Sequence, residues 1–395
     1  MTTAPRNFEI PSLDGVRALA VLLVFLAHAG LTLPGNFGVT VFFFLSGYLI
    51  TTLLRLELER TGHLSLRDFY LRRAFRILPP MYVVLAAAVV LTLIGFIPGT
   101  VSASAVAMQS LHLTNYRVIS SGWWDGIAPG TWIYWSLAVE EHFYLLFPLV
   151  YLGIRRIIPS ARGQAGAILG LCVVVLAWRL FLVLGLDVSK ERTYIASDTR
   201  IDSILFGCAL AVFGNPALDP TSIAARRWKW VLVPLSGAAL AATFLVRDPR
   251  FEETLRYSLQ GVALIPLFVV AVRYPTWAPI RFLNNRWVRF CGVLSYAIYL
   301  VHPTVIWTVQ QRTTLHPIVQ GAIALAVTML LALGIHVFIE RPFATLRRRL
   351  AKVHRSGADG SRAAARQERT AEGVLALLVP ATGEPSSTTA PPQLT

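Results

Sequence analysis

Apolar runs of roughly twenty residues recur along most of this 395-residue chain, from Gly15 to Phe338. A helix needs about 20 apolar residues to cross a lipid bilayer, at about 1.5 Å of rise per residue. Ten segments meet this requirement, although the sixth is short and carries Arg200 and Asp202. These segments are 14–33, 37–56, 77–98, 135–155, 164–186, 200–214, 229–246, 257–273, 289–311 and 318–340. A weaker apolar stretch over 100–118 predicts a partial or interfacial helix.

The composition agrees with a chain that lies mostly in the membrane. It is 55% hydrophobic and 14% charged, whereas soluble domains carry about a quarter charged residues. A soluble globule with one anchor is therefore excluded. We predict an all-α polytopic transmembrane bundle of about ten helices over residues 1–343. Residues 344–395 are expected to form a tail that is first basic and then disordered. The three cysteines lie in apolar runs and match no metal-site spacing, so no metal is expected.

Positive charge alternates along the chain in a way that predicts its orientation. With the N-terminus inside, the cytoplasmic segments hold 23 lysines and arginines and the external loops hold 8. Cytoplasmic loops of membrane proteins concentrate these residues. We therefore predict a multi-pass protein of the plasma membrane with both termini in the cytoplasm. The net charge of +15 has the same explanation, and nucleic acid is not an expected partner.

The first apolar segment contains two ionisable residues, Arg17 and His28. They are eleven residues apart, which corresponds to about 16 Å of helix rise and to nearly the same helix face. Ionisable side chains inside a span usually indicate function. The alternatives are an arginine that snorkels to the interface and a histidine that bonds to a neighbouring helix. The shared face favours a functional role.

Two further segments carry ionisable residues at a similar predicted depth. His302 lies in SYAIYLVHP, and Glu140 begins the run Glu140-Glu141-His142. With His28, these side chains are expected to form a buried proton-handling centre. The alternatives are a structural polar network between helices and, for His302-Pro303, a helix kink whose ring caps freed carbonyls.

A cluster of arginines precedes the third apolar segment. Arg72, Arg73 and Arg76 lie at helical spacing in LRDFYLRRAFRILP. Ordinary cytoplasmic charge and the binding of lipid headgroups are one interpretation. The other is an anion clamp, because the guanidinium fork fits phosphate groups.

Seven segments in order resemble the acyltransferase 3 family of membrane O-acyltransferases, and the resemblance covers Leu13 to Phe343. The first helix is similar to the family's pattern of an arginine and a histidine separated by ten residues, and His142 stands where the family more usually has glutamine. The segments are LDGVRALAVLLVFLAHAG, GVTVFFFLSGYLIT, FYLRRAFRILPP, YWSLAVEEHFYLLFP, RIDSILFG, LSYAIYLVHP and IERPF.

The resemblance implies an enzyme that transfers an acyl group, often acetyl, from acyl-coenzyme A to a hydroxyl group. Acyl-coenzyme A would be a co-substrate, with no permanently bound cofactor. Typical acceptors are sugars of surface polysaccharides, peptidoglycan, lipids and macrolides. At the matching positions His28 would be the catalytic base, and Glu140 and His302 would complete the catalytic site. Arg17, Arg73 and Arg76 would bind the donor. A transporter or flippase for a glycoconjugate is the alternative function.

Overall fold

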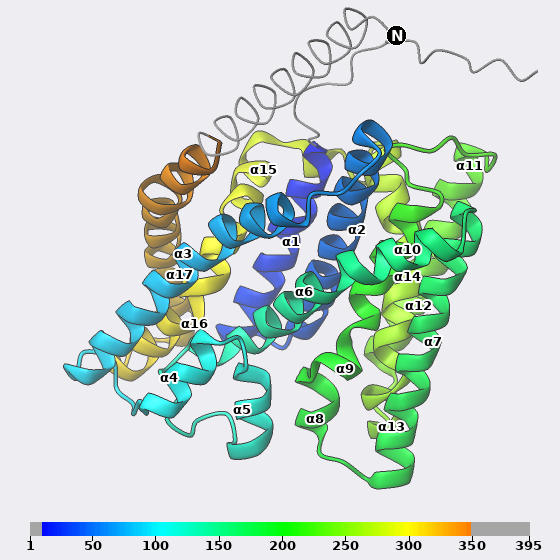
Figure 1. Cartoon of the computed structure of the whole chain (residues 1–395). Coiled ribbons are helices and arrows are strands. Elements are labelled where there is room, and N and C mark those ends of the chain that lie inside the picture. Colours follow the sequence, from blue (N-terminus) through cyan, green and yellow to red (C-terminus); the bar gives the residue numbers. More distant parts are fainter. Residues whose placement is uncertain (1–9, 349–395) are drawn as a thin grey trace, which may run out of the picture. The chain divides into compact units, whose positions relative to one another are not determined.

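The computed structural model describes residues 10–348, and these form helices and connections without any strand (Figure 1). The chain divides into two compact units, Met1–Phe343 and Ala344–Thr395. The predicted N-terminal segment before residue 10, and nearly all of the predicted tail, lie outside the described residues. In the first unit the all-α prediction is confirmed.

Among residues 10–348, eight helical segments are long and apolar enough to cross a membrane. They are α1 (Pro11–His28), α2 (Gly35–Thr61), α3 (Leu66–Leu93), η1 with α6 (Thr131–Ile133, Tyr134–Ile157), α7 (Ala161–Leu186), α11 with η2 and α12 (Ala225–Arg227, Trp228–Leu232, Val233–Leu245), α14 (Leu255–Arg273), and α17 with η4 (Pro317–Ile335, His336–Glu340). The helices α15 (Arg286–Val293) and α16 (Ser295–Arg312) are long and apolar enough only as a pair bent by 69°, which forms either a broken ninth span or a re-entrant segment.

The tenth predicted segment is the short helix α10 (Asp202–Val212), which follows α9 (Ser197–Arg200) after one residue. Every residue of α10 is buried, so this helix lies in the centre of the bundle. Each of the ten apolar segments thus corresponds to a helix. The sixth segment, already expected to be short, is a buried helix rather than a full-length span.

Paired glycines allow α10 to cross α2 at close range. A Cβ atom on Gly47 would lie 2.0 Å from the carbonyl oxygen of Ile204, and one on Gly207 would lie 2.0 Å from that of Phe44. Neither atom could be accommodated, so both positions require glycine. Small residues on both sides of a crossing are the usual way in which membrane helices approach one another.

Short helices join the spans. They are α4 (Ala103–Ser110), α5 (Thr114–Ser121), α8 (Lys190–Ile195), α13 (Pro249–Glu253) and η3 (Arg281–Asn284). The stretch predicted as a partial helix over 100–118 thus folds as α4 and most of α5. In Figure 1, α4, α5, α8 and α13 gather at the end of the bundle opposite the start of α1.

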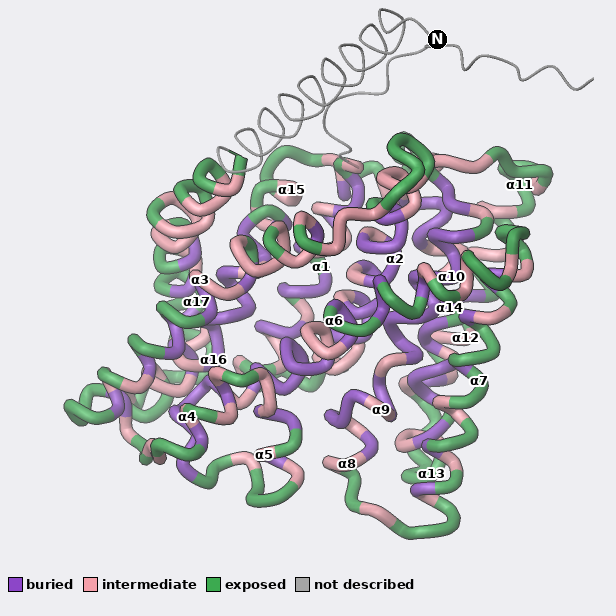
Figure 2. Tube along the Cα trace, in the orientation of Figure 1, coloured by how far each residue is buried: buried purple, intermediate pink, exposed green. Residues whose placement is uncertain are grey.

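Burial separates a central group of helices from a peripheral group. The 18-residue windows of α2 and α14 are 72% and 61% buried, whereas those of α7 and α17 are 22% and 17% buried. Figure 2 shows the same contrast between the centre and the outer helices. Exposed leucines, valines and phenylalanines cover the outer helices. Apolar surface on this scale is expected where helices contact lipid, which identifies a multi-pass membrane protein.

Candidate active site

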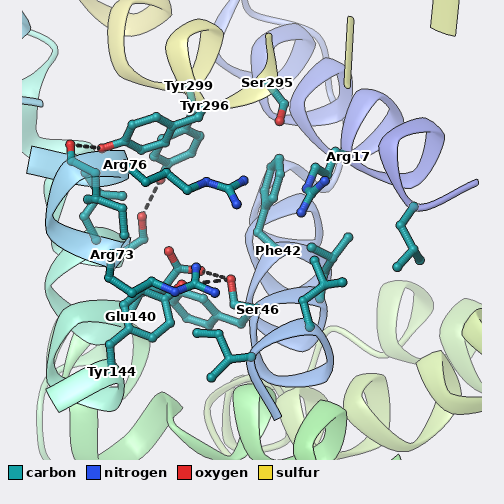
Figure 3. A pocket seen from close by; sticks show the side chains of 18 of the residues that line it. Arg17, Phe42, Ser46, Arg73, Arg76, Glu140, Tyr144, Ser295, Tyr296 and Tyr299 are labelled. Atoms are coloured by element: carbon teal, nitrogen blue, oxygen red, sulfur yellow. Dashed lines mark hydrogen bonds between the residues drawn. The ribbon is translucent and has the colours of Figure 1, made fainter. Parts of the chain in front are cut away.

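Two cavities lie between the central helices. Most of the ionisable residues singled out by the sequence line one or the other of these cavities. The first, of about 320 Å³, is here called the arginine cavity (Figure 3). Its wall combines helices α1, α2, α3, α6 and α16. The polar residues on this wall are Asp14, Arg17, Ser46, Arg73, Arg76, Ser136, Glu140, Tyr144, Ser295, Tyr296 and Tyr299.

Three guanidinium groups dominate the charge of the arginine cavity. Arg17 donates to Asp14 over 2.8 Å, one helical turn before it. The guanidinium of Arg73 lies 5.1 Å from the centre of the Tyr144 ring, and that of Arg76 extends toward Arg17 (Figure 3). Within residues 10–348, neither Arg73 nor Arg76 has an ion-pair partner. Two arginine forks are therefore available to an anion.

Glu140 belongs to the arginine cavity. Its Oε1 accepts a hydrogen bond of 2.6 Å from the Ser46 hydroxyl, which in turn accepts one of 3.2 Å from Tyr144. His28, in contrast, lines the other cavity, and His302 is buried behind it in hydrogen-bond contact with His28. The expectation that Glu140 would join His28 and His302 in one centre is thus wrong as a matter of placement. Depth along a helix, which was all that the sequence provided, does not say which neighbour a side chain faces.

The second cavity, of about 540 Å³, is here called the histidine cavity. His28, at the end of α1, lines this cavity. The rest of the wall is rich in aromatic residues and carries few charged groups. The aromatic residues are Trp123, Trp132, Trp135, Tyr194, Phe244 and Tyr299, and the other polar residues are Thr32, Asn36, Thr243, Arg247, Arg256 and Gln260.

His28 and His302 are hydrogen-bonded to each other. His28 Nδ1 lies 3.0 Å from His302 Nε2, and His302 is fully buried. His302 Nδ1 lies 2.9 Å from the carbonyl oxygen of Tyr299 and 3.1 Å from that of Ile298. A carbonyl oxygen can only accept, so this nitrogen carries the hydrogen. In the neutral pair, His302 Nε2 then accepts from His28 Nδ1–H. This leaves the Nε2 lone pair of His28 free.

The two cavities share part of their walls. Val39 and Tyr299 line both of them. The Tyr299 hydroxyl is fixed 2.6 Å from Ser136 Oγ, and its carbonyl holds His302. Arg17 and His28, eleven residues apart on α1, line the arginine and the histidine cavity respectively. The shared helix face inferred from their spacing is consistent with this placement.

Other ionisable residues of the same segments lie outside both cavities. His142 contacts Ser197 Oγ at 2.7 Å and stacks on Tyr116. Arg72 pairs with Glu57 at 2.7 Å. Each step along a helix turns the side chain by about 100°, so Arg72 points about 100° from Arg73, and His142 about 200° from Glu140.

A fully buried ion pair joins α7 to α10. Arg179 on α7 reaches Asp202 at the start of α10 over 2.9 Å, and Ser258 donates to the same carboxylate over 2.7 Å. The neighbouring Arg200 lies over the Tyr257 ring at 3.9 Å. Of the two charges that made this segment look unlike a membrane span, Asp202 is thus paired inside the bundle, and Arg200 donates to Thr40 Oγ1 and to the carbonyl oxygen of Tyr194.

Several residues of the site were not predicted from the sequence. Ser46 and Tyr299 lie inside two of the segments that resemble the acyltransferase family, so a closer examination of those segments would have found them. Trp135 likewise lies inside the family-like segment YWSLAVEEHFYLLFP, whereas Trp123, Trp132, Arg247 and Arg256 lie in or beside connections between spans. Nothing in their local sequence distinguishes them from ordinary interfacial residues.

Comparison with known proteins adds independent information. The family model described as an acyltransferase domain matches residues 10–337. The peptidoglycan O-acetyltransferase OatA of Listeria monocytogenes is 31% identical over 358 residues, which cover 86% of this chain and 57% of that protein. The O-acetyltransferase OatA of Staphylococcus aureus is 30% identical over 354 residues, with 84% and 57% covered. The chain thus spans little more than half the length of these relatives.

No solved structure matches the chain. The family assignment rests on the match over residues 10–337, which includes every segment that carries the two cavities. The segments that resemble the family from Leu13 onward lie in that range, apart from the segment IERPF. This chain belongs to the family defined by the acyltransferase domain.

Proposed function

We propose that the chain is an integral membrane O-acyltransferase. It transfers an acyl group, in the first instance acetyl, from acyl-coenzyme A to a hydroxyl group of a carbohydrate-containing acceptor. Acceptors of this class are surface polysaccharides, glycolipids and macrolide-type metabolites. The observation that carries the proposal is the His28–His302 hydrogen bond of 3.0 Å in a cavity that adjoins a second, arginine-lined cavity.

The arginine cavity suits the phosphate end of the donor. Arg73 and Arg76 present guanidinium forks, and Arg17 adds a third positive group beside Asp14. Arginine forks bind phosphate oxygens in pairs, which gives both affinity and orientation. In the orientation predicted from loop charges, with both termini in the cytoplasm, this cavity opens toward the compartment that contains coenzyme A.

The histidine cavity suits the acceptor and the chemical step. His28 Nε2 takes the proton of an acceptor hydroxyl while the oxygen of that hydroxyl attacks the thioester carbonyl carbon. The carbon–sulfur bond breaks, and the coenzyme leaves as a thiolate that receives the proton from His28. His302 accepts the Nδ1–H bond of His28 throughout and so fixes the ring and its tautomer. Glu140, bonded to Ser46, shapes the donor cavity.

Val39 and Tyr299 mark the place where the acyl arm would pass from one cavity to the other. The rise between Arg17 and His28 is about 16 Å. An extended pantetheine arm of similar length joins the phosphates of coenzyme A to its sulfur. A donor with its phosphates at the arginines would therefore bring its thioester to His28. The acetyl group is favoured because both OatA relatives are named O-acetyltransferases.

The decisive experiment compares two histidine variants of the full chain in membranes. Labelled acetyl-coenzyme A is supplied with candidate acceptors, and product and free coenzyme are both measured. We expect His28→Ala to lose at least about a hundredfold in rate, the lower range for general-base catalysis. His63→Ala is the matched control, because His63 is exposed in the turn before α3. Full activity of His28→Ala would contradict the proposal, and acceptor movement without thioester cleavage would favour a transporter.

A further inference from the structure

The histidine cavity has an unusual charge distribution. Arg247 and Arg256 line it, and its wall contains no aspartate or glutamate among residues 10–348. The proposed acyl transfer needs a histidine and room for an acceptor, but it does not need two arginines. Such a pair in a cavity without carboxylates calls for a ligand that brings negative charge.

Arg256 is poorly satisfied by the protein. The residue is only 7% exposed, yet its Nε atom has no hydrogen-bond partner in the described part of the chain. Its terminal nitrogens make long contacts, 3.3 Å to Glu252 and 3.3 Å to the Tyr257 hydroxyl. A buried guanidinium normally requires a close acceptor. An anionic group in the cavity would supply it.

The carboxylate that pairs with the two arginines is shared by three cations. Glu252 lies 3.6 Å from Arg247, 3.6 Å from Lys190 and 3.3 Å from Arg256. Glu253 also lies near Lys190 and Arg256, so two carboxylates face three cations, and these five side chains together keep a net positive charge. Glu252 is not part of the cavity wall. The side of the arginines that faces the cavity is therefore available to a ligand.

The rest of the wall suits a sugar ring. Trp123, Trp132 and Trp135 offer flat apolar faces against which the C–H faces of a sugar can pack. Asn36 and Gln260 add amide groups that can bond hydroxyls. The volume of about 540 Å³ lies within the roughly 300–1,000 Å³ of small-molecule sites. The cavity thus combines sugar contacts with two cations.

We infer that the histidine cavity selects an acidic sugar, whose carboxylate or phosphate is bound by Arg256 and Arg247 while a hydroxyl reaches His28. This inference rests on the proposed function for the acceptor role of the cavity. It adds a specificity site that discriminates among carbohydrate acceptors by charge.

Binding to the full chain in lipid nanodiscs tests the inference without acyl-coenzyme A. The probes are a trimer of galacturonic acid and its carboxyl-reduced counterpart, which differ only in the acidic group. Maltotriose phosphate and maltotriose form a second pair and distinguish phosphate from carboxylate. Affinity is followed through tryptophan fluorescence, since three tryptophans line the cavity. We expect at least one acidic probe to bind about tenfold tighter than its neutral partner.

Three variants locate the effect. Arg256→Gln and Arg247→Gln are expected to lose the preference for the acidic probe. Arg247 is 78% exposed, so the second variant remains informative if the first does not fold. Lys190→Gln is the matched control, because Lys190 lies at the same 3.6 Å from Glu252 but outside the cavity wall. It is expected to keep the preference.

Each other outcome overturns the inference. These outcomes are equal affinity for acidic and neutral probes, no binding of either, a preference that survives both arginine variants, and an equal loss in Lys190→Gln. Failure of the proposed function is a separate result. The inference would stand if acidic probes bound selectively in wild type and in His28→Ala while no acetyl transfer to any acceptor was found.

Discussion

His302 differs from His28 in that both of its ring nitrogens are engaged, one by the carbonyl oxygens of Ile298 and Tyr299 and the other by His28. It cannot take a proton from an acceptor, so we regard it as the residue that positions His28. His302→Leu should lower the turnover rate about a hundredfold or more, because the wrong tautomer of a base is ineffective. The donor KM should stay unchanged.

A conservative variant separates positioning from packing at this residue. The side-chain oxygen of glutamine can accept the Nδ1–H bond of His28, so His302→Gln should recover part of the turnover lost in His302→Leu. Steady-state kinetics of the two variants, with expression and thermal stability as controls, provide the measurement. Equal loss in both variants would mean that His302 serves packing rather than the orientation of His28.

Arg72 and Arg73 are neighbours in sequence with different surroundings, which makes them a natural pair for comparison. Arg73 lines the arginine cavity, whereas Arg72 lies in a salt bridge of 2.7 Å to Glu57. Arg73→Ala should raise the KM for acyl-coenzyme A about tenfold or more, the value of one charged hydrogen bond. Arg72→Ala should leave it nearly unchanged. The measurement is a titration of the donor at saturating acceptor. Equal effects of the two substitutions on the donor KM would contradict a specific anion site.

At the scale of elements, much of the fold could be predicted from the sequence. The ten apolar runs located every long helix among residues 10–348, and the eleven-residue spacing placed Arg17 and His28 along one face of α1. The break between α15 and α16 was not visible, because it falls inside one apolar run and no proline marks it. The cavity that Glu140 faces was equally hidden. Which of its neighbours a helix faces depends on tertiary packing, and one sequence without partners does not contain that information.

The crossing of α2 and α10 gives a prediction about stability. Gly207→Ala places a methyl group against the backbone of α2, 2.0 Å from the Phe44 oxygen, so the helices must separate. Overpacking of this kind costs about 1–3 kcal/mol, and thermal unfolding in detergent should show a lower midpoint. Gly170→Ala on α7 is the control, since no atom lies within 4 Å of its added methyl group. Equal midpoints in the two variants would contradict the close crossing.

The turn between α4 and α5 predicts a local dependence on pH. Burial, and secondarily the neighbouring His142, lowers the pKa of His112 to about 4. A free histidine has a pKa of about 6.5, so the folded turn resists protonation. The contribution of neutral His112 to the stability of the turn is fully present above about pH 6.5 and is lost as the pH drops toward 4. Hydrogen exchange in 111–121, corrected for the intrinsic rate, should increase between pH 7 and pH 5. His112→Gln should remove this change.

At the scale of the whole molecule, the proposed function requires the two cavities to open to different sides of the membrane. Each cavity by itself could be formed in many helix bundles. Their shared wall at Val39 and Tyr299 allows a donor from one side and an acceptor from the other to meet at His28. The orientation predicted from loop charges decides which side is which, and therefore it is part of the proposed mechanism rather than a detail of topology.

Single cysteines test this orientation directly. In a background with Cys172, Cys208 and Cys291 replaced by alanine, Arg247→Cys lies at the mouth of the histidine cavity and Arg60→Cys at the opposite end, where α2 finishes. A membrane-impermeant thiol reagent should label position 247 in intact cells, and position 60 only after permeabilisation. Inside-out vesicles should also use added acetyl-coenzyme A, whereas right-side-out vesicles should not. The reverse labelling pattern would place the arginine cavity in a compartment without coenzyme A, and the proposed donor would then have to be abandoned even though both cavities remained.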